Sequence, residues 1–361
     1  MIRNDYIYDH GLELPDLCDF PGAGESLYPI GINFDHVANV RYAFELMDIG
    51  KFRKAWIEMV EDIRSHIISF NPQEEKILGK QNSKIFKSVK LYFESCKGQV
   101  ERTEIPATPL FNTLDHDGCV GFHGQQKILD DIRSHMSSEI EELLAIEDHV
   151  AKPHDYDRFY LYNEAQNEKL FHLVRQLFND KGVFDAVTKY NRTARDMDLN
   201  SIALHVATPT DTHHYMTLRD LSATSELVSL HMDPKYNLMK AMVYLNEVDK
   251  DTGPFTTLPT SNRWAYDQLQ RLVACGNSTG NYLDNPVKRK VMRCFPPEFR
   301  KNVILGRYIQ DGTLISSKML GMLHEWTSDE ADCIIFDPTQ TLHRGGLCKN
   351  KKRVNLQILM R

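Results

Sequence analysis

The chain has 361 residues, a formal net charge of −7, 42% hydrophobic residues and 26% charged residues. These values are typical of a globular chain that forms one large domain with an extension, or two domains. The acidic balance argues against general nucleic-acid binding, which usually shows a basic excess. No segment approaches the roughly 20 apolar residues that span a bilayer. We therefore expect neither a nucleic-acid nor a membrane partner.

The seven cysteines are scattered, odd in number and contain no CxxC pair. This pattern favours neither a zinc knuckle nor a redox dithiol. The first residues lack the apolar core of a secretion signal. Free thiols are normal in a reducing compartment, so the sequence predicts a cytoplasmic location.

The amino-terminal third predicts a mostly helical extension over residues 1–108. About 35 turn-rich residues come first and read as irregular chain. Apolar residues then recur at helical spacing over 52–67, and a second helix is expected over 83–96. Pro106 and Pro109 mark the border of this extension.

The remainder, residues 109–361, predicts helices followed by an antiparallel run of strands. A strand with Gly118 at its start is expected over 114–122, and helices over 128–144 and 164–178. Further strands are expected over 201–206, 227–231, 240–245, 333–336 and 353–360. This order is typical of an α+β chain built on a sandwich or barrel. Residues 264–329 read as a lid-like insertion over one mouth of that barrel.

The strongest chemical signal is the triplet His231-Met232-Asp233 with His343 far downstream. Residues i and i+2 of a strand share a face, so His231 and Asp233 would enter one interior. A triplet of this type alone arises by chance about once in such a chain. The alternative is a polar strand end that is exposed to solvent and binds no metal. Two histidines and one carboxylate form the facial set that holds Fe(II) and leaves coordination positions open.

Arg353 opens a last strand that alternates between apolar and polar residues. An edge strand with its polar face in water would give the same pattern. If the polar face lines a cavity instead, the two-pronged guanidinium of Arg353 would bind the distal carboxylate of 2-oxoglutarate. The residues therefore predict an oxygenase that uses Fe(II), O2 and 2-oxoglutarate.

From about residue 110 onward the chain resembles the phytanoyl-CoA dioxygenase family of Fe(II)/2-oxoglutarate oxygenases. Four blocks in the family's order carry the resemblance: residues 114–124, 231–233, 241–261 and 331–353. Several positions depart from the family pattern: Thr260 and Asn262 stand where its glycine and histidine are usual, and Ala331 stands where its Gly-Asp turn has glycine. Gly345 also replaces a small polar residue that often contacts the co-substrate.

The resemblance implies a double-stranded β-helix, a jelly-roll barrel with helices packed on its larger sheet. It implies His231, Asp233 and His343 as iron ligands and Arg353 as the 2-oxoglutarate clamp. Strand alternation places three further residues on one face as candidates to line the cavity, although ordinary sheet packing is an equal alternative. These residues are Lys240, Met242 and Tyr244.

Hydroxylation of a small molecule is the leading prediction, with succinate and CO2 as the co-products. A non-catalytic jelly-roll that binds a ligand or partner protein is the alternative from another class. A third possibility is a metalloenzyme with the same ligands and no 2-oxo acid. A basic cluster at 288–293 is compatible with an anionic substrate, although a solvated helix face is the commoner cause. The sequence leaves the substrate and the oligomeric state open.

Overall fold

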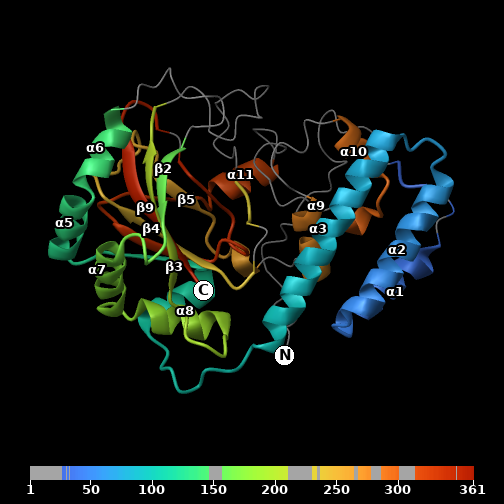
Figure 1. Cartoon of the computed structure of the whole chain (residues 1–361), viewed down its shortest axis with the longest axis horizontal. Coiled ribbons are helices and arrows are strands. Elements are labelled where there is room, and N and C mark those ends of the chain that lie inside the picture. Colours follow the sequence, from blue (N-terminus) through green and yellow to red (C-terminus); the bar gives the residue numbers. More distant parts are fainter. Residues whose placement is uncertain are drawn as a thin grey trace.

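The computed structural model describes residues 27–361 except 30, 32, 146–156, 210–229, 234–235, 264–266, 278–285, 301–313 and 347. Two sheets with surrounding helices lie on one side of the molecule, and a group of helices lies on the other (Figure 1). The first residues, most of the expected strand 227–231, and Cys18 lie outside the described residues.

The larger sheet has six strands in the order β1-β7-β4-β9-β3-β2, and each neighbouring pair is antiparallel. Its strands are β1 (Cys119–Phe122), β2 (Asp157–Tyr162), β3 (Leu199–Ala207), β4 (Met239–Tyr244), β7 (Cys333–Phe336) and β9 (Arg353–Met360). The expected strands over 201–206, 240–245, 333–336 and 353–360 are confirmed. Apolar residues recur at the two-residue period of a half-buried strand over 201–206 and 353–360, whereas 240–245 and 333–336 are nearly continuous apolar runs.

The smaller sheet has three strands in the order β6-β5-β8. They are β5 (Phe255–Thr257), β6 (His324–Trp326) and β8 (His343–Arg344). An isolated antiparallel bridge joins His231 to His343 at the free edge of β8. The two sheets pack together through a buried cluster that includes Met242, Tyr244, Ile334 and Phe336 of the larger sheet and Phe255 and Trp326 of the smaller. The described residues therefore form a two-sheet sandwich.

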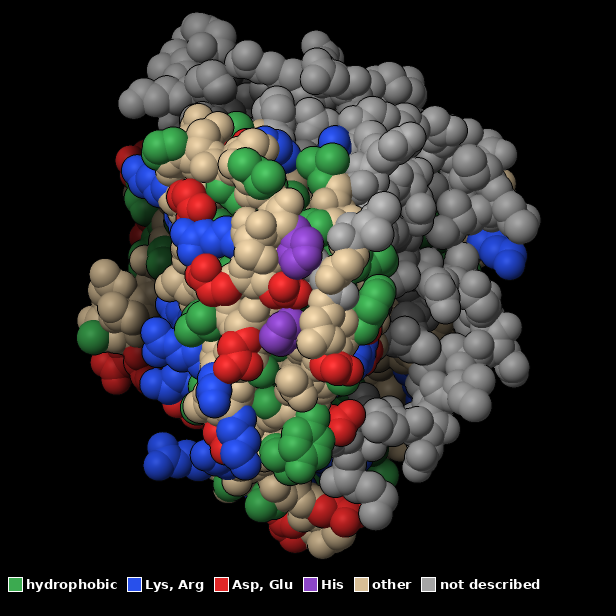
Figure 2. Space-filling view, turned by 90° about the vertical axis from the view of Figure 1, so that its right-hand side faces the viewer, with side chains coloured by type: hydrophobic (Ala, Val, Ile, Leu, Met, Phe, Trp, Pro, Cys, Tyr) green, Lys and Arg blue, Asp and Glu red, His purple; other side chains and the backbone are tan. Residues whose placement is uncertain are grey.

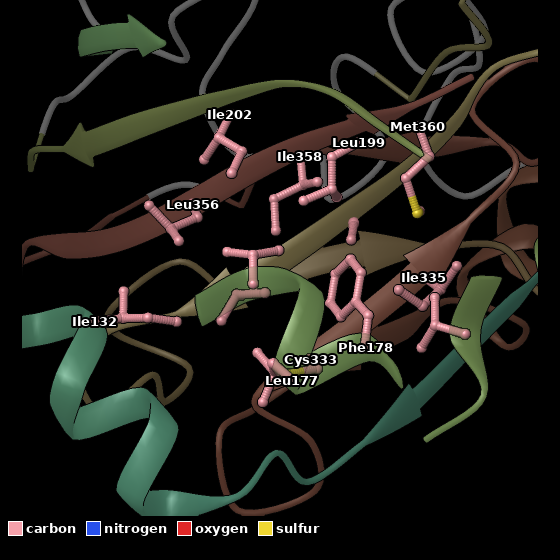
Figure 3. Packing of buried hydrophobic residues seen from close by; sticks show 14 of the residues in the cluster. Ile132, Leu177, Phe178, Leu199, Ile202, Cys333, Ile335, Leu356, Ile358 and Met360 are labelled. Atoms are coloured by element: carbon pink, nitrogen blue, oxygen red, sulfur yellow. The ribbon is translucent and has the colours of Figure 1, made fainter. Parts of the chain in front are cut away.

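Helices cover the outer face of the larger sheet. They are α4 (Pro109–Asp117), α5 (Gln126–His135), α6 (Ser137–Ala145), α7 (Glu168–Asn179) and α8 (Val183–Asn191). Their apolar residues pack against the outward side chains of β9 and its neighbours (Figure 3). Leu356, Ile358 and Met360 contribute from β9, and Leu177 and Phe178 from α7. Alternation along β9 therefore directs one set of residues to this core and the other set between the sheets.

A second hydrophobic core lies among the helices on the other side of the molecule. It joins α1 (Phe34–Glu45), α2 (Ile49–His66) and α3 (Pro72–Lys97) to α9 (Gln268–Asn277), α10 (Pro286–Arg293) and the 3-10 turn Pro297–Phe299. Helices α9 and α10 of the expected insertion 264–329 thus pack on α3 (Figure 1). Lys290 of the basic cluster at 288–293 pairs with Glu74 at 2.8 Å. The last helix of this segment is α11 (Leu314–Leu320).

The surface on this side mixes both signs of charge. Figure 2 views the molecule from the side where α1 and α2 lie, and lysines, arginines and acidic residues are interspersed over the described part of the visible face. Among the described helices, none combines the length and the apolar character needed to cross a bilayer.

Three expected elements differ from the structure. The helix expected over 83–96 begins earlier, because it is part of α3 (Pro72–Lys97). The helix over 128–144 is broken at Met136, so that α5 and α6 are separate helices. The expected strand over 114–122 begins only after Gly118, because residues up to Asp117 belong to α4. Gly118 ends α4 with φ +72°, a left-handed conformation that glycine adopts without steric cost.

Candidate metal centre

Backbone pairing brings the two distant histidines together. The amide nitrogen of His231 lies 3.0 Å from the carbonyl oxygen of His343, and the reverse pair is 2.9 Å apart. Two residues later, the amide of Asp233 donates to the carbonyl oxygen of Pro338 at 2.6 Å. Both ends of the triplet are therefore fixed to the segment that carries His343.

The side chains of His231, Asp233 and His343 converge on one point. One potential ligand atom from each lies within 4.8 Å of the others. Asp233 Oδ1 is 3.6 Å from His231 Nε2 and 3.9 Å from His343 Nε2. Two imidazole nitrogens and one carboxylate oxygen are donors that suit Fe(II), so the donor set fits a ferrous ion.

His343 is held in the form that can bind a metal. Its Nδ1 lies 2.9 Å from the carbonyl oxygen of Thr341, which makes Nδ1 the donor and leaves Nε2 to face Asp233. The ring is buried, with the ring of Phe336 at a centroid distance of 4.9 Å. Burial, followed by the charges of His231 and Lys240, lowers the pKa of His343 to about 3. A neutral imidazole follows, and that is the form that binds metals.

Asp233 is kept ionised although it is largely buried. Burial alone raises the pKa of a carboxyl group. Its contact with His231 and the positive charge of Lys240 outweigh burial and hold the pKa of Asp233 well below its usual range. Lys240 Nζ donates to Asp233 Oδ2 at 2.5 Å.

Arg353 is a buried cation next to Gly346, which follows the strand that carries His343. Its Nη1 donates to the carbonyl oxygens of Gly253 and Gly346, and its Nε donates to Asn355 Oδ1 at 3.2 Å. Within the described part of the chain, Arg353 has no carboxylate at ion-pair distance. A buried guanidinium with only neutral acceptors is costly unless an anion binds to it. The site therefore suits a ligand that carries a carboxylate.

The three candidates for cavity lining have different surroundings. Met242 and Tyr244 are buried in the cluster between the sheets, and Tyr244 donates its hydroxyl hydrogen to the carbonyl oxygen of Trp326. Their surroundings are those of packing residues. Lys240 instead contacts Asp233, which strand alternation could not reveal because it indicates a face and not a partner.

No protein-family model and no curated protein sequence matches the chain. Solved structures are similar at low identity. The carbocyclase SnoK of nogalamycin biosynthesis, described as non-haem and α-ketoglutarate-dependent, is 11% identical, with a TM-score of 0.41 over 71% of this chain and 84% of its own. EctD from S. alaskensis with 2-oxoglutarate and 5-hydroxyectoine is 13% identical, with a TM-score of 0.41 over 73% of this chain and 79% of its own.

The epimerase SnoN, solved with Fe3+ and α-ketoglutarate, is 14% identical, with a TM-score of 0.39 over 70% of this chain and 81% of its own. At these identities and TM-scores, the similarity establishes neither the fold nor the chemistry of this chain. The chemical assignment depends on the side chains that meet at the site.

Proposed function

We propose that the chain is an Fe(II)- and 2-oxoglutarate-dependent dioxygenase that hydroxylates a small molecule. The observation that carries this proposal is the convergence of His231, Asp233 and His343 within 4.8 Å. The buried Arg353 supports it, because 2-oxoglutarate brings a carboxylate that none of the described residues supplies there.

Each residue has a defined task in this proposal. His231, Asp233 and His343 would hold the iron, and Thr341 keeps the imidazole of His343 in the ligating tautomer. Arg353 would bind the distal carboxylate of 2-oxoglutarate and so orient its 2-oxo acid end. Bound iron would supply the oxidative decarboxylation of 2-oxoglutarate by O2, which yields succinate and CO2 and is coupled to hydroxylation of the substrate.

The finer classification is also part of the proposal. It includes a closed double-stranded β-helix, membership of the phytanoyl-CoA dioxygenase family, an oxygenase domain over 109–361 and a cytoplasmic location. The two-sheet sandwich and the bridge between His231 and His343 support the jelly-roll reading. The order of the sequence blocks supports the family.

Turnover of 2-oxoglutarate by the reconstituted protein tests the proposal. The metal-free chain is loaded with Fe(II) without oxygen, given 2-oxoglutarate, ascorbate and air, and assayed for succinate. We expect succinate formation that requires Fe(II) and falls at least about 100-fold in His231→Ala, because a lost metal ligand removes the reaction centre. His172→Ala, at an exposed position of α7, is the matched control and should keep full turnover.

Thermal shifts distinguish the alternatives. The proposal expects Mn(II) to stabilise the protein and 2-oxoglutarate to add to that stabilisation. Stabilisation by Mn(II) alone would favour a metalloenzyme without a 2-oxo acid. No shift with either ligand, together with no Fe(II)-dependent succinate formation by the wild type, would leave a non-catalytic binding protein.

A further inference from the structure

The two oxygens of the Asp233 carboxylate face different partners. Oδ1 points to the side where His231 and His343 present their Nε2 atoms, at 3.6 and 3.9 Å. Oδ2 accepts a hydrogen bond from Lys240 Nζ at 2.5 Å. One oxygen is therefore directed to the metal position and the other is held by an ammonium group.

Lys240 is fixed where it makes this contact. It lies in β4, opposite Phe336 of β7 and Leu359 of β9, so its backbone is anchored on both sides. Its side chain is only 15% exposed, and that of Asp233 only 17%. Among the described carboxylates, Asp233 alone lies within ion-pair distance of Lys240. A partly buried ion pair of this kind is screened far less by salt than one on the surface.

The contact between Lys240 and Asp233 matters because a metal ion has a limited number of coordination positions. A free carboxylate can bind a metal with one oxygen or with both. Three protein donors on one face leave three positions, and a chelating 2-oxo acid takes two of them. If Asp233 bound with both oxygens, it would occupy a position that the co-substrate and O2 require.

We propose that Lys240 is a positioning residue that restricts Asp233 to one-oxygen coordination by holding Oδ2 away from the metal. The consequence of this restriction, a coordination position left open for the co-substrate and O2, rests on the proposed function. The restriction itself concerns only the metal and the protein, and it can be measured without 2-oxoglutarate.

Two substitutions separate the hydrogen bond from the charge. Lys240→Gln keeps a side-chain N–H that can donate to Oδ2 but removes the charge. Lys240→Met removes both at similar length. Lys127→Met, at an exposed position of α5, is the matched control. Circular dichroism of each variant establishes that it is folded before any ligand is added.

Co(II) serves as the probe metal because its visible absorption changes with its ligands and their geometry. We expect wild type, Lys127→Met and Lys240→Gln to share one Co(II) spectrum, and Lys240→Met to show a different one, because the second Asp233 oxygen would replace a bound water at one of the open positions. In titrations followed by this spectrum, Lys240→Met should bind 2-oxoglutarate about 10–100-fold more weakly, the usual range for losing a partner of a metal ligand. Lys240→Gln should stay within about threefold of wild type, since the hydrogen bond to Oδ2 is kept.

Two results would overturn the inference. One is a Co(II) spectrum of Lys240→Met that matches wild type. The other is an equal loss of 2-oxoglutarate affinity in Lys240→Gln and Lys240→Met, because Lys240 would then act by its charge on the co-substrate and not by holding Asp233. Failure of the wild type to bind 2-oxoglutarate would refute the proposed function alone, and the Co(II) spectra would still decide the role of Lys240.

Discussion

At the scale of single residues, the charges around the metal position are unevenly matched. Lys240 is neutralised by Asp233, whereas Arg353 meets only neutral oxygens in the described part of the chain. Since an unmatched buried cation is costly, the free energy of the site falls when an anion reaches Arg353. That asymmetry supports the proposal that the co-substrate carboxylate binds to Arg353 and not to Lys240.

Replacing Arg353 by lysine tests this assignment. Arg353→Lys keeps the charge but loses the fork that binds a carboxylate with two hydrogen bonds. Loss of one charge-assisted hydrogen bond costs about 1.5–3 kcal/mol, so we expect the dissociation constant of 2-oxoglutarate to rise roughly 10–100-fold. Calorimetry on the Mn(II)-loaded protein measures this, with the exposed Lys349→Ala as the control. Unchanged 2-oxoglutarate affinity in a variant that still binds Mn(II) would place the carboxylate elsewhere.

At the scale of elements, the turn after β8 links His343, the proposed metal ligand, to Arg353, the proposed clamp of 2-oxoglutarate. Gly346 follows β8 and lies against the backbone of Gly253 and Pro254, where an added Cβ would collide. The carbonyl oxygens of both Gly346 and Gly253 accept from Arg353. The close approach of these two backbones therefore sets the position of the guanidinium.

A methyl group at this contact should displace Arg353 more than it displaces the three proposed metal ligands. Because backbone atoms cannot move aside as a flexible side chain can, we expect Gly346→Ala to cost on the order of 1–3 kcal/mol in stability. We expect a larger loss of 2-oxoglutarate affinity than of Mn(II) affinity. Urea denaturation and ligand titrations check both. Gly79→Ala is the control, because that helical position has open space and alanine is the better helix former. Equal losses in the two variants would contradict the steric argument.

Short-range patterns account for the elements that sequence predicted well. Strand β9 and helix α2 have clear apolar periods, and β4 and β7 are short, nearly continuous apolar runs, so each lies where its pattern predicts it. The break at Met136 was missed because apolar spacing continues from α5 into α6 across it. The contact of Lys240 with Asp233 could not be predicted, since β4 and the end of the triplet meet only in the folded chain.

At the scale of the whole molecule, the second core joins two distant stretches of sequence. Trp56 of α2 is fully buried, with the rings of Phe295 and Phe299 at centroid distances of 5.8 and 5.5 Å. Local periodicity carries no information on such a pairing, so the amino-terminal helices and the insertion were expected to be separate units. Because they share a core, the amino-terminal helices and the segment 264–329 stabilise each other.

A double-mutant cycle between Trp56 and Phe299 measures that mutual stabilisation. Removal of either buried aromatic ring should cost about 3–5 kcal/mol in urea unfolding. The double variant should lose less than the sum of the two, with a coupling of about 0.5–3 kcal/mol, because the first substitution already removes the contact. Phe34→Ala, at a side chain 72% exposed, should change stability little. Strict additivity would mean that the two stretches fold independently despite their contact. A single cooperative transition with non-zero coupling would show that the amino-terminal helices fold together with the segment between β5 and β6.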